Sequence, residues 1–147
     1  MDIKTTLQSD LKDAMRHGEE TRKSTLRMAL SAIKLAEVEK GAHMDETAYL
    51  AVLQKEIKAR RESIADAEKA NRPELVTQAE EEIKVLQGYL PAALTQEELE
   101  SMAKAAITEV GATSIREMGQ VMKNLMPRLL GRATGDQASQ VVRKLLQ

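Results

Sequence analysis

The apolar residues of this chain recur at the spacing of an α-helix. Near the N-terminus they fall three or four positions apart, which places them on one face of a helix. A second stripe runs from Leu26 to Ala36, and Gly18 and Gly41 each follow a stripe at a position suited to end a helix. Long β-branched runs and period-two alternation are missing from the sequence. The pattern predicts an all-α protein. The first stripe consists of Ile3, Leu7, Leu11, Ala14 and Met15.

Two longer helices are predicted on either side of Asn71-Arg72-Pro73. Asp45 is a suitable N-cap for the first of them, because its carboxylate can accept from a free backbone amide. Pro73 suits the first turn of the second, where a missing amide costs little. A break this short between long helices predicts an antiparallel hairpin. The positions expected to face inward on the second helix are Leu75, Val76, Ala79, Ile83 and Leu86.

The segment from Gly88 to Leu94 interrupts the helical pattern. It predicts two domains: an N-terminal helical hairpin or bundle over residues 1–90, and a compact three-helix module over residues 95–147. Thr95 and Ser114 are each followed three residues later by Glu, the pattern of a capping box. In the module, Pro127 is expected to break the second helix, Gly131 and Gly135 to form a turn, and Asp136 to cap the third helix.

Composition limits the chemistry of the chain. There is no cysteine, which excludes disulfides, thiol catalysis and thiolate metal sites. There is no Phe or Trp, so the core must be aliphatic, with eight Met that can fill it or form adaptable surfaces. The N-terminus lacks the apolar core of a signal peptide, and no apolar run approaches the ~20 residues of a membrane span. We therefore expect a cytoplasmic protein without a membrane partner.

No constellation of a catalytic or metal site is found in the sequence. His17 and His43 are isolated, with no His or Cys at ligand spacing. No Ser stands in a Gly-x-Ser-x-Gly turn, and no glycine-rich phosphate loop is present. The expectation is no catalytic residue, no metal and no cofactor. Arg27 lies beside the second apolar stripe, and we expect it to form a partly buried ion pair with Glu37, Glu39 or Glu56.

The net charge of −1 argues against bulk electrostatic binding to nucleic acid, but the C-terminal residues are basic. Residues 112–147 hold six basic side chains against Glu117 and Asp136. Cations on loops and helix ends contact phosphates without reading sequence. With no aromatic side chain nearby, stacking on bases is not expected. Gly131 and Gly135 would allow backbone amides to approach a phosphate. On charge alone, a solvated basic surface remains the alternative. The candidate RNA-binding residues are Lys123, Arg128, Arg132, Arg143 and Lys144.

Several stretches resemble the YqeY family over nearly the whole chain. They are Leu26-Arg27-Met28, Ala70 to Leu75, Tyr89 to Leu99, Met118 to Lys123, Gly131-Arg132-Ala133, and the residues from Val141 onward. Residues 95–147 are also similar to the tail domain of the B subunit of the tRNA-dependent amidotransferase. In that enzyme the tail helps to hold tRNA, and catalysis lies in a separate cradle domain that residues 1–94 do not resemble. The resemblance thus implies tRNA affinity on the same five cations, without amide formation.

Three functions are consistent with the sequence. The first is a non-catalytic accessory protein that binds tRNA or another structured RNA through the C-terminal module. The second is an adaptor whose Met-rich helical surfaces take a helix of a partner protein. The third is an accessory subunit linked to glutamine-dependent tRNA amidotransfer, a carbon–nitrogen ligase by domain similarity only. The sequence does not determine the oligomeric state.

Overall fold

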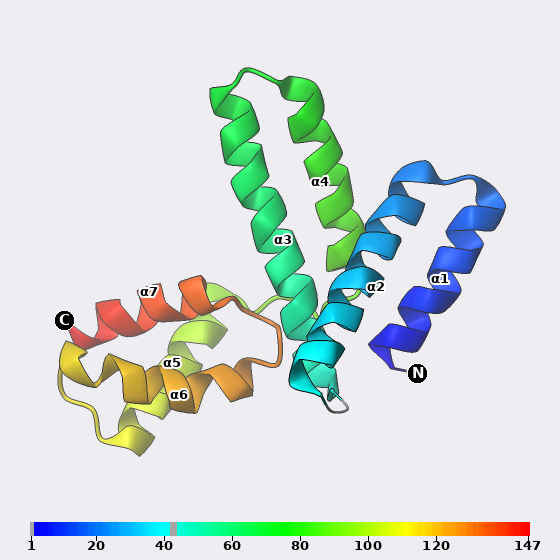
Figure 1. Cartoon of the computed structure of the whole chain (residues 1–147). Coiled ribbons are helices and arrows are strands. Elements are labelled where there is room, and N and C mark those ends of the chain that lie inside the picture. Colours follow the sequence, from blue (N-terminus) through cyan, green and yellow to red (C-terminus); the bar gives the residue numbers. More distant parts are fainter. Residues whose placement is uncertain (1, 42–43) are drawn as a thin grey trace. The chain divides into compact units, whose positions relative to one another are not determined.

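The computed structural model describes residues 2–41 and 44–147, and within these residues the chain forms helices and no strands (Figure 1). The prediction of an all-α protein is confirmed. The chain divides into two compact units, one that ends at Leu90 and one that begins at Pro91. The helices are α1 (Ile3–His17), α2 (Glu20–Lys40), α3 (Glu46–Lys69), α4 (Pro73–Gln87), α5 (Gln96–Val110), a 3₁₀ turn η1 (Ile115–Glu117), α6 (Met118–Leu129) and α7 (Gly135–Leu146).

The N-terminal unit consists of two helical hairpins. One pairs α1 with α2, the other pairs α3 with α4, and α2 packs against both helices of the second hairpin (Figure 1). Its core is aliphatic, and burial of each large side chain contributes about 1.5–3 kcal/mol. The side chains with no exposed surface include Leu7, Leu26, Ile33, Leu53 and Leu86.

Local signals set the ends of these helices as the sequence predicts. Gly18 and Gly41 adopt left-handed conformations, with φ of 66° and 64°, directly after α1 and α2. The Asp45 carboxylate accepts from the Ala48 amide at 2.9 Å and caps α3. Pro73 is the first residue of α4. The predicted Asp45 cap and the predicted start at Pro73 are both confirmed.

Two residues predicted to face inward are exposed instead. Met15 is 51% exposed and Leu75 is 47% exposed. Helix α1 packs mainly against α2, so only a narrow stripe through Leu7 and Ala14 is buried. Leu75 lies in the first turn of α4, next to the turn that joins the second hairpin, and the buried side of α4 begins one turn later at Ala79.

The C-terminal unit is a bundle in which α5, α6 and α7 each pack against the other two. Thr95 and Glu98 form the predicted capping box at the start of α5, with Thr95 Oγ1 accepting from the Glu98 amide at 3.1 Å. The core is built mostly from small and medium aliphatic side chains. Its buried members are Leu99, Ala103, Ala106, Val121, Leu125, Leu129, Ala133, Ala138, Val141 and Val142.

The start of α6 differs from the prediction. Ser114 makes no side-chain cap, and residues 115–117 form a 3₁₀ turn before α6 begins. The Glu117 carboxylate reaches back to Thr113 instead, accepting from its amide at 3.3 Å and its hydroxyl at 3.2 Å. The acidic side chain thus stabilises the turn that precedes the helix rather than a box at Ser114.

The segment between α6 and α7 also differs from the prediction. Pro127 does not break α6, which continues to Leu129. Because proline stands in the last turn, its missing amide removes one intrahelical bond close to where the helix ends anyway. Asp136 is not the cap of α7. Thr134 is, in a capping box with Gln137, and Gly135 is the first residue of the helix rather than part of the turn.

Candidate functional site

Arg128 of α6 is held by the neighbouring helix of its own unit. Its guanidinium donates to the Glu109 carboxylate of α5, and Asn124 donates to the same oxygen at 3.4 Å. The hydrogen bond from Arg128, followed by the one from Asn124, lowers the pKa of Glu109 below its ordinary value. Arg128 is therefore engaged in packing α6 against α5, and its positive charge is largely offset.

Arg132 is likewise engaged within the C-terminal unit. Its Nε donates to the Ala92 carbonyl at 2.9 Å, and Nη2 lies 4.0 Å from the Glu98 carboxylate. Its own carbonyl accepts from the Leu94 amide at 2.8 Å. These contacts join the segment before α5 to the turn between α6 and α7. The sequence predicted a phosphate ligand at Arg132, and the structure gives it a set of internal partners.

The remaining three candidate cations are available to solvent. Lys123 projects from α6, and Arg143 and Lys144 project from the last turn of α7, and all three are exposed. No acidic side chain forms an ion pair with any of them among the described residues. Arg116, which was not among the predicted site residues, is also exposed on η1. The C-terminal unit therefore presents exposed cations on η1, α6 and α7.

The buried arginine of the N-terminal unit is Arg60 on α3. It is 7% exposed, whereas Arg27, for which a partly buried ion pair was predicted, is exposed. Arg60 Nη1 donates to the Glu56 carbonyl at 3.0 Å and to its carboxylate at 3.3 Å. Its Nε lies 3.8 Å from the Glu82 carboxylate on α4 and makes no hydrogen bond. The arginine thus lies between two carboxylates without satisfying both.

A signal for Arg60 is present in the sequence. Leu53, Ile57 and Ala67 are buried on α3, and Arg60 lies on the same stripe, at spacings of three and four from Ile57 and Ile64. A charged residue at an inward position of a helix is unusual. Its periodicity therefore indicates burial.

A groove lies beside Arg60, between α3 and α4, with a volume of about 700 Å³. Small side chains form much of its lining, and Met28 contributes from α2. Arg60, Glu56 and Glu82 also line it. Arg60, which is 7% exposed, thus forms part of the wall of this groove.

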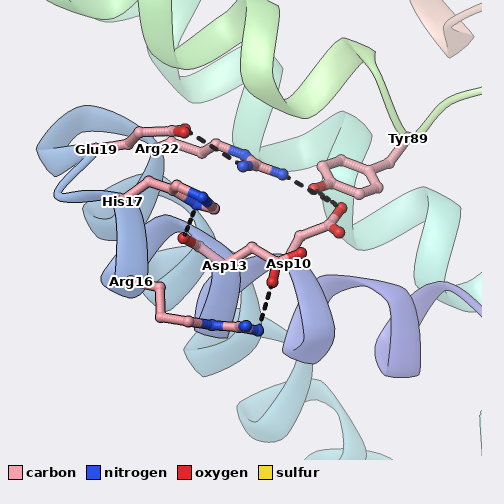
Figure 2. Close-up of polar contacts among 7 residues, drawn as sticks. All are labelled: Asp10, Asp13, Arg16, His17, Glu19, Arg22 and Tyr89. Carbon is pink, nitrogen blue, oxygen red and sulfur yellow. Dashed lines mark hydrogen bonds and ion pairs between the residues drawn. The ribbon is translucent and has the colours of Figure 1, made fainter.

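A polar cluster fixes the end of the N-terminal unit to its first hairpin. The Tyr89 hydroxyl, which follows α4, donates to the Asp10 carboxylate of α1 at 2.5 Å (Figure 2). Arg22 of α2 lies 3.8 Å from the same carboxylate and also pairs with Glu19 at 3.3 Å. Burial is the main cause that raises the pKa of Tyr89 to about 12. The bond to Asp10 acts in the same direction, and Arg22 opposes it.

His17 takes no part in a metal site among the described residues. The His17 ring contacts the Asp13 carbonyl at 2.8 Å in the last turn of α1 (Figure 2), and His43 lies outside the described residues. Within residues 2–41 and 44–147, no three His, Cys, Asp or Glu side chains are grouped so that they would hold a metal ion. In the same residues, no helix has the length and apolar character required to cross a membrane.

A match to a known family covers nearly the whole chain. The sequence profile of the family described as "Yqey-like protein" matches residues 4–146, which include both units. This chain belongs to the YqeY family. The motif residues Tyr89 and Arg132 of this YqeY-family chain are those that the structure places in the Asp10 cluster and in the contact to Ala92.

Fungal proteins named "Altered inheritance of mitochondria protein 41, mitochondrial" are similar to the chain. The protein of Vanderwaltozyma polyspora is 39% identical over 62% of this chain and 51% of its own length. The protein of Lachancea thermotolerans is 36% identical over 72% of this chain and 57% of its own length. The protein of Pyrenophora tritici-repentis is 31% identical over 96% of this chain and 77% of its own length. The match thus spans little more than half the length of the first two relatives. Their names place them in mitochondria, and a cytoplasmic location for this chain stays a prediction.

Proposed function

We propose that this YqeY-family chain is a non-catalytic accessory protein that binds the phosphate backbone of a structured RNA, such as tRNA, through its C-terminal unit. The observation that carries the proposal is the exposure of Lys123, Arg143 and Lys144 without an acidic partner among the described residues. Similarity of residues 95–147 to the amidotransferase tail, which helps to hold tRNA, supports the choice of ligand.

The proposed site is narrower than the sequence alone suggests. Arg128 and Arg132 are engaged by Glu109 and Glu98, so a phosphate would have to compete with a carboxylate for either of them. A phosphate that binds Lys123, Arg143 or Lys144 has no carboxylate of the described residues to compete with. We therefore assign them the direct contacts, and we assign Arg128 and Arg132 the role of holding the bundle that presents those contacts.

Recognition in this site is of charge and shape. Residues 91–147 contain no aromatic side chain, so bases cannot stack on an aromatic ring there. Phosphate contacts fix a nucleic acid in place without reading its sequence. The expected preference is for an RNA whose folded backbone brings several phosphates close together.

The experiment compares two triple variants in a tRNA titration at increasing salt. One carries Lys123→Glu, Arg143→Glu and Lys144→Glu. The control carries Lys12→Glu, Lys34→Glu and Lys55→Glu, which change the net charge equally at exposed positions of the N-terminal unit. We expect the first variant to bind at least about tenfold more weakly, and its salt slope to fall by roughly 0.7–0.9 for each lost contact. Equal losses in both variants, with helicity retained, would contradict the proposal.

A further inference from the structure

The groove between α3 and α4 has the shape to receive side chains of another molecule. Ala59, Ala67, Ala70 and Ala79 line it and leave its centre unfilled, within a volume of about 700 Å³. Two large apolar side chains border it, Met28 at 51% and Leu75 at 47% exposure. Small residues in the lining and flexible apolar ones beside it are features of a groove that accommodates the apolar face of a helix.

The charged groups in this groove are incompletely satisfied. Arg60 Nε is buried and makes no hydrogen bond, and a Glu82 carboxylate oxygen is 3.8 Å away. The Glu82 side chain is only 15% exposed, and no donor lies within hydrogen-bond distance of it among the described residues. The Glu82 carboxylate can therefore accept a hydrogen bond from a ligand in the groove.

The charge of the groove indicates the sign of that ligand. Glu56, Asp66 and Glu82 line it together with Arg60 and Arg72. Arg72 is already bound to Glu74, with its Nε 2.5 Å from the carboxylate. Three carboxylates thus line the groove with two guanidinium groups, an excess of one negative charge (3 − 2). A cationic donor therefore matches both the unsatisfied carboxylate and the local charge.

We propose that this groove is the docking site for an amphipathic helix of a partner protein, one that presents apolar side chains flanked by Lys or Arg. The apolar residues, spaced three and four apart, enter the alanine-lined centre between Met28 and Leu75. A flanking cation donates to Glu82, which is then shared between the partner and Arg60. The site belongs to the N-terminal unit and is independent of the RNA contact proposed for the C-terminal unit.

The test uses synthetic helical peptides of about 14 residues with an apolar stripe at i, i+3, i+4 and i+7. Three peptides carry Leu, Met or Phe in the stripe and Lys at the other positions, and matched peptides carry Glu in place of Lys. Fluorescence anisotropy measures their binding to the full-length chain. We expect at least one Lys peptide to bind and the Glu peptides to bind at least about tenfold more weakly.

Variants then locate the contact. Glu82→Gln and Ala70→Trp, the second at an exposed lining position, are each expected to weaken the Lys peptide about tenfold or more. Glu80→Gln, which makes the same charge change at an exposed position of α4 outside the groove, is expected to leave binding unchanged. If Glu82→Gln loses helicity, Ala70→Trp carries the test.

Three results of the peptide experiments would overturn the proposal. They are failure of all Lys peptides to bind, binding unaffected by both Glu82→Gln and Ala70→Trp, and equal binding of the Glu peptides. Self-association of the chain that Ala70→Trp abolishes would assign the groove to a second copy, and would also overturn it. The tRNA titration of the Lys123 variant is unaffected by any of these outcomes, so the two proposals fail separately.

Discussion

The hydroxyl of Tyr89 donates to the carboxylate of Asp10 at 2.5 Å, a bond between residues 79 positions apart in the chain. It joins the segment that follows α4 to the first helix of the same unit. Arg22, from α2, lies beside the same carboxylate at 3.8 Å (Figure 2). Three elements of the N-terminal unit thus meet at one acidic group, and the segment before Pro91 is anchored to the first hairpin.

Removal of this hydroxyl should destabilise the N-terminal unit. Tyr89→Phe leaves the half-buried Asp10 with Arg22 alone, and we expect a loss of about 1.5–3 kcal/mol in the free energy of unfolding, the range for a bond to a charged group. Urea denaturation followed by circular dichroism measures it. Tyr49→Phe is the comparison variant. Tyr49 donates to the Glu37 carboxylate, which keeps its partner Lys4, at 2.9 Å, when the Tyr49 hydroxyl is removed. A loss for Tyr89→Phe no larger than for Tyr49→Phe would contradict the expectation.

Ionisation of Tyr89 should be delayed to strongly alkaline pH. Burial first, and the bond to Asp10 second, raise its pKa from 10.0 to about 12. Because the folded pKa lies above the unfolded one, this group stabilises the fold fully below pH 10.0, and that contribution is lost as pH rises toward 12. The Tyr49→Phe variant has Tyr89 as its single tyrosine, so tyrosinate absorbance during a pH titration reports it alone. Half-ionisation near pH 10 in a still helical protein would contradict this.

The Arg128–Glu109 pair should be visible in the titration of the carboxylate. Arg128 lowers the pKa of Glu109, so Arg128→Gln is expected to return that pKa toward 4.5. Because the pKa of Glu109 is lower in the folded state than in the unfolded state, the pair stabilises the fold above pH 4.5. This stabilisation is lost as the pH falls through the folded-state pKa. Side-chain carboxyl NMR measures the shift. Lys123→Gln is the control, and it should leave the Glu109 pKa in place.

The Arg60 cluster should behave as a coupled unit. Arg60→Met leaves Glu56 and Glu82 without their shared cation, and we expect it to cost about 1–3 kcal/mol. Glu82→Gln should be less harmful in the Arg60→Met background than in the original chain, because it then removes an uncompensated charge. A double-mutant cycle in urea measures this coupling, expected at about 0.5–3 kcal/mol. Arg61→Met, at the exposed neighbouring position, should change stability by less than about 0.5 kcal/mol. Additive effects at Arg60 and Glu82 would show that the groups act independently.

Features set by neighbouring residues were predictable from the sequence. The Asp45 cap, the start of α4 at Pro73 and the Thr95 box each depend on bonds within a few positions. At Ser114 a local signal failed because Thr113 offers the Glu117 carboxylate two donors, and the chain forms a 3₁₀ turn.

Features set by packing were not predictable in the same way. Arg128 pairs with Glu109 nineteen positions earlier, and Arg132 reaches Ala92 forty positions earlier. Neither partner follows from helical periodicity, so the sequence counted both arginines as available cations. The unsatisfied Nε of Arg60 depends on where α4 places Glu82. Helix positions are thus encoded locally, whereas the availability of a charged side chain is decided by the helix packed against it.

The anchoring of Tyr89, together with the position of Tyr49 on α3, places both aromatic residues of the chain in the N-terminal unit. Intrinsic tyrosine fluorescence therefore senses the melting of that unit alone, whereas far-ultraviolet circular dichroism senses the helices of both. Thermal curves recorded in the two signals on one sample compare the cooperativity of the two units without any label. Coincident curves mean that the two units melt over the same temperature range, and separated curves give each unit its own transition.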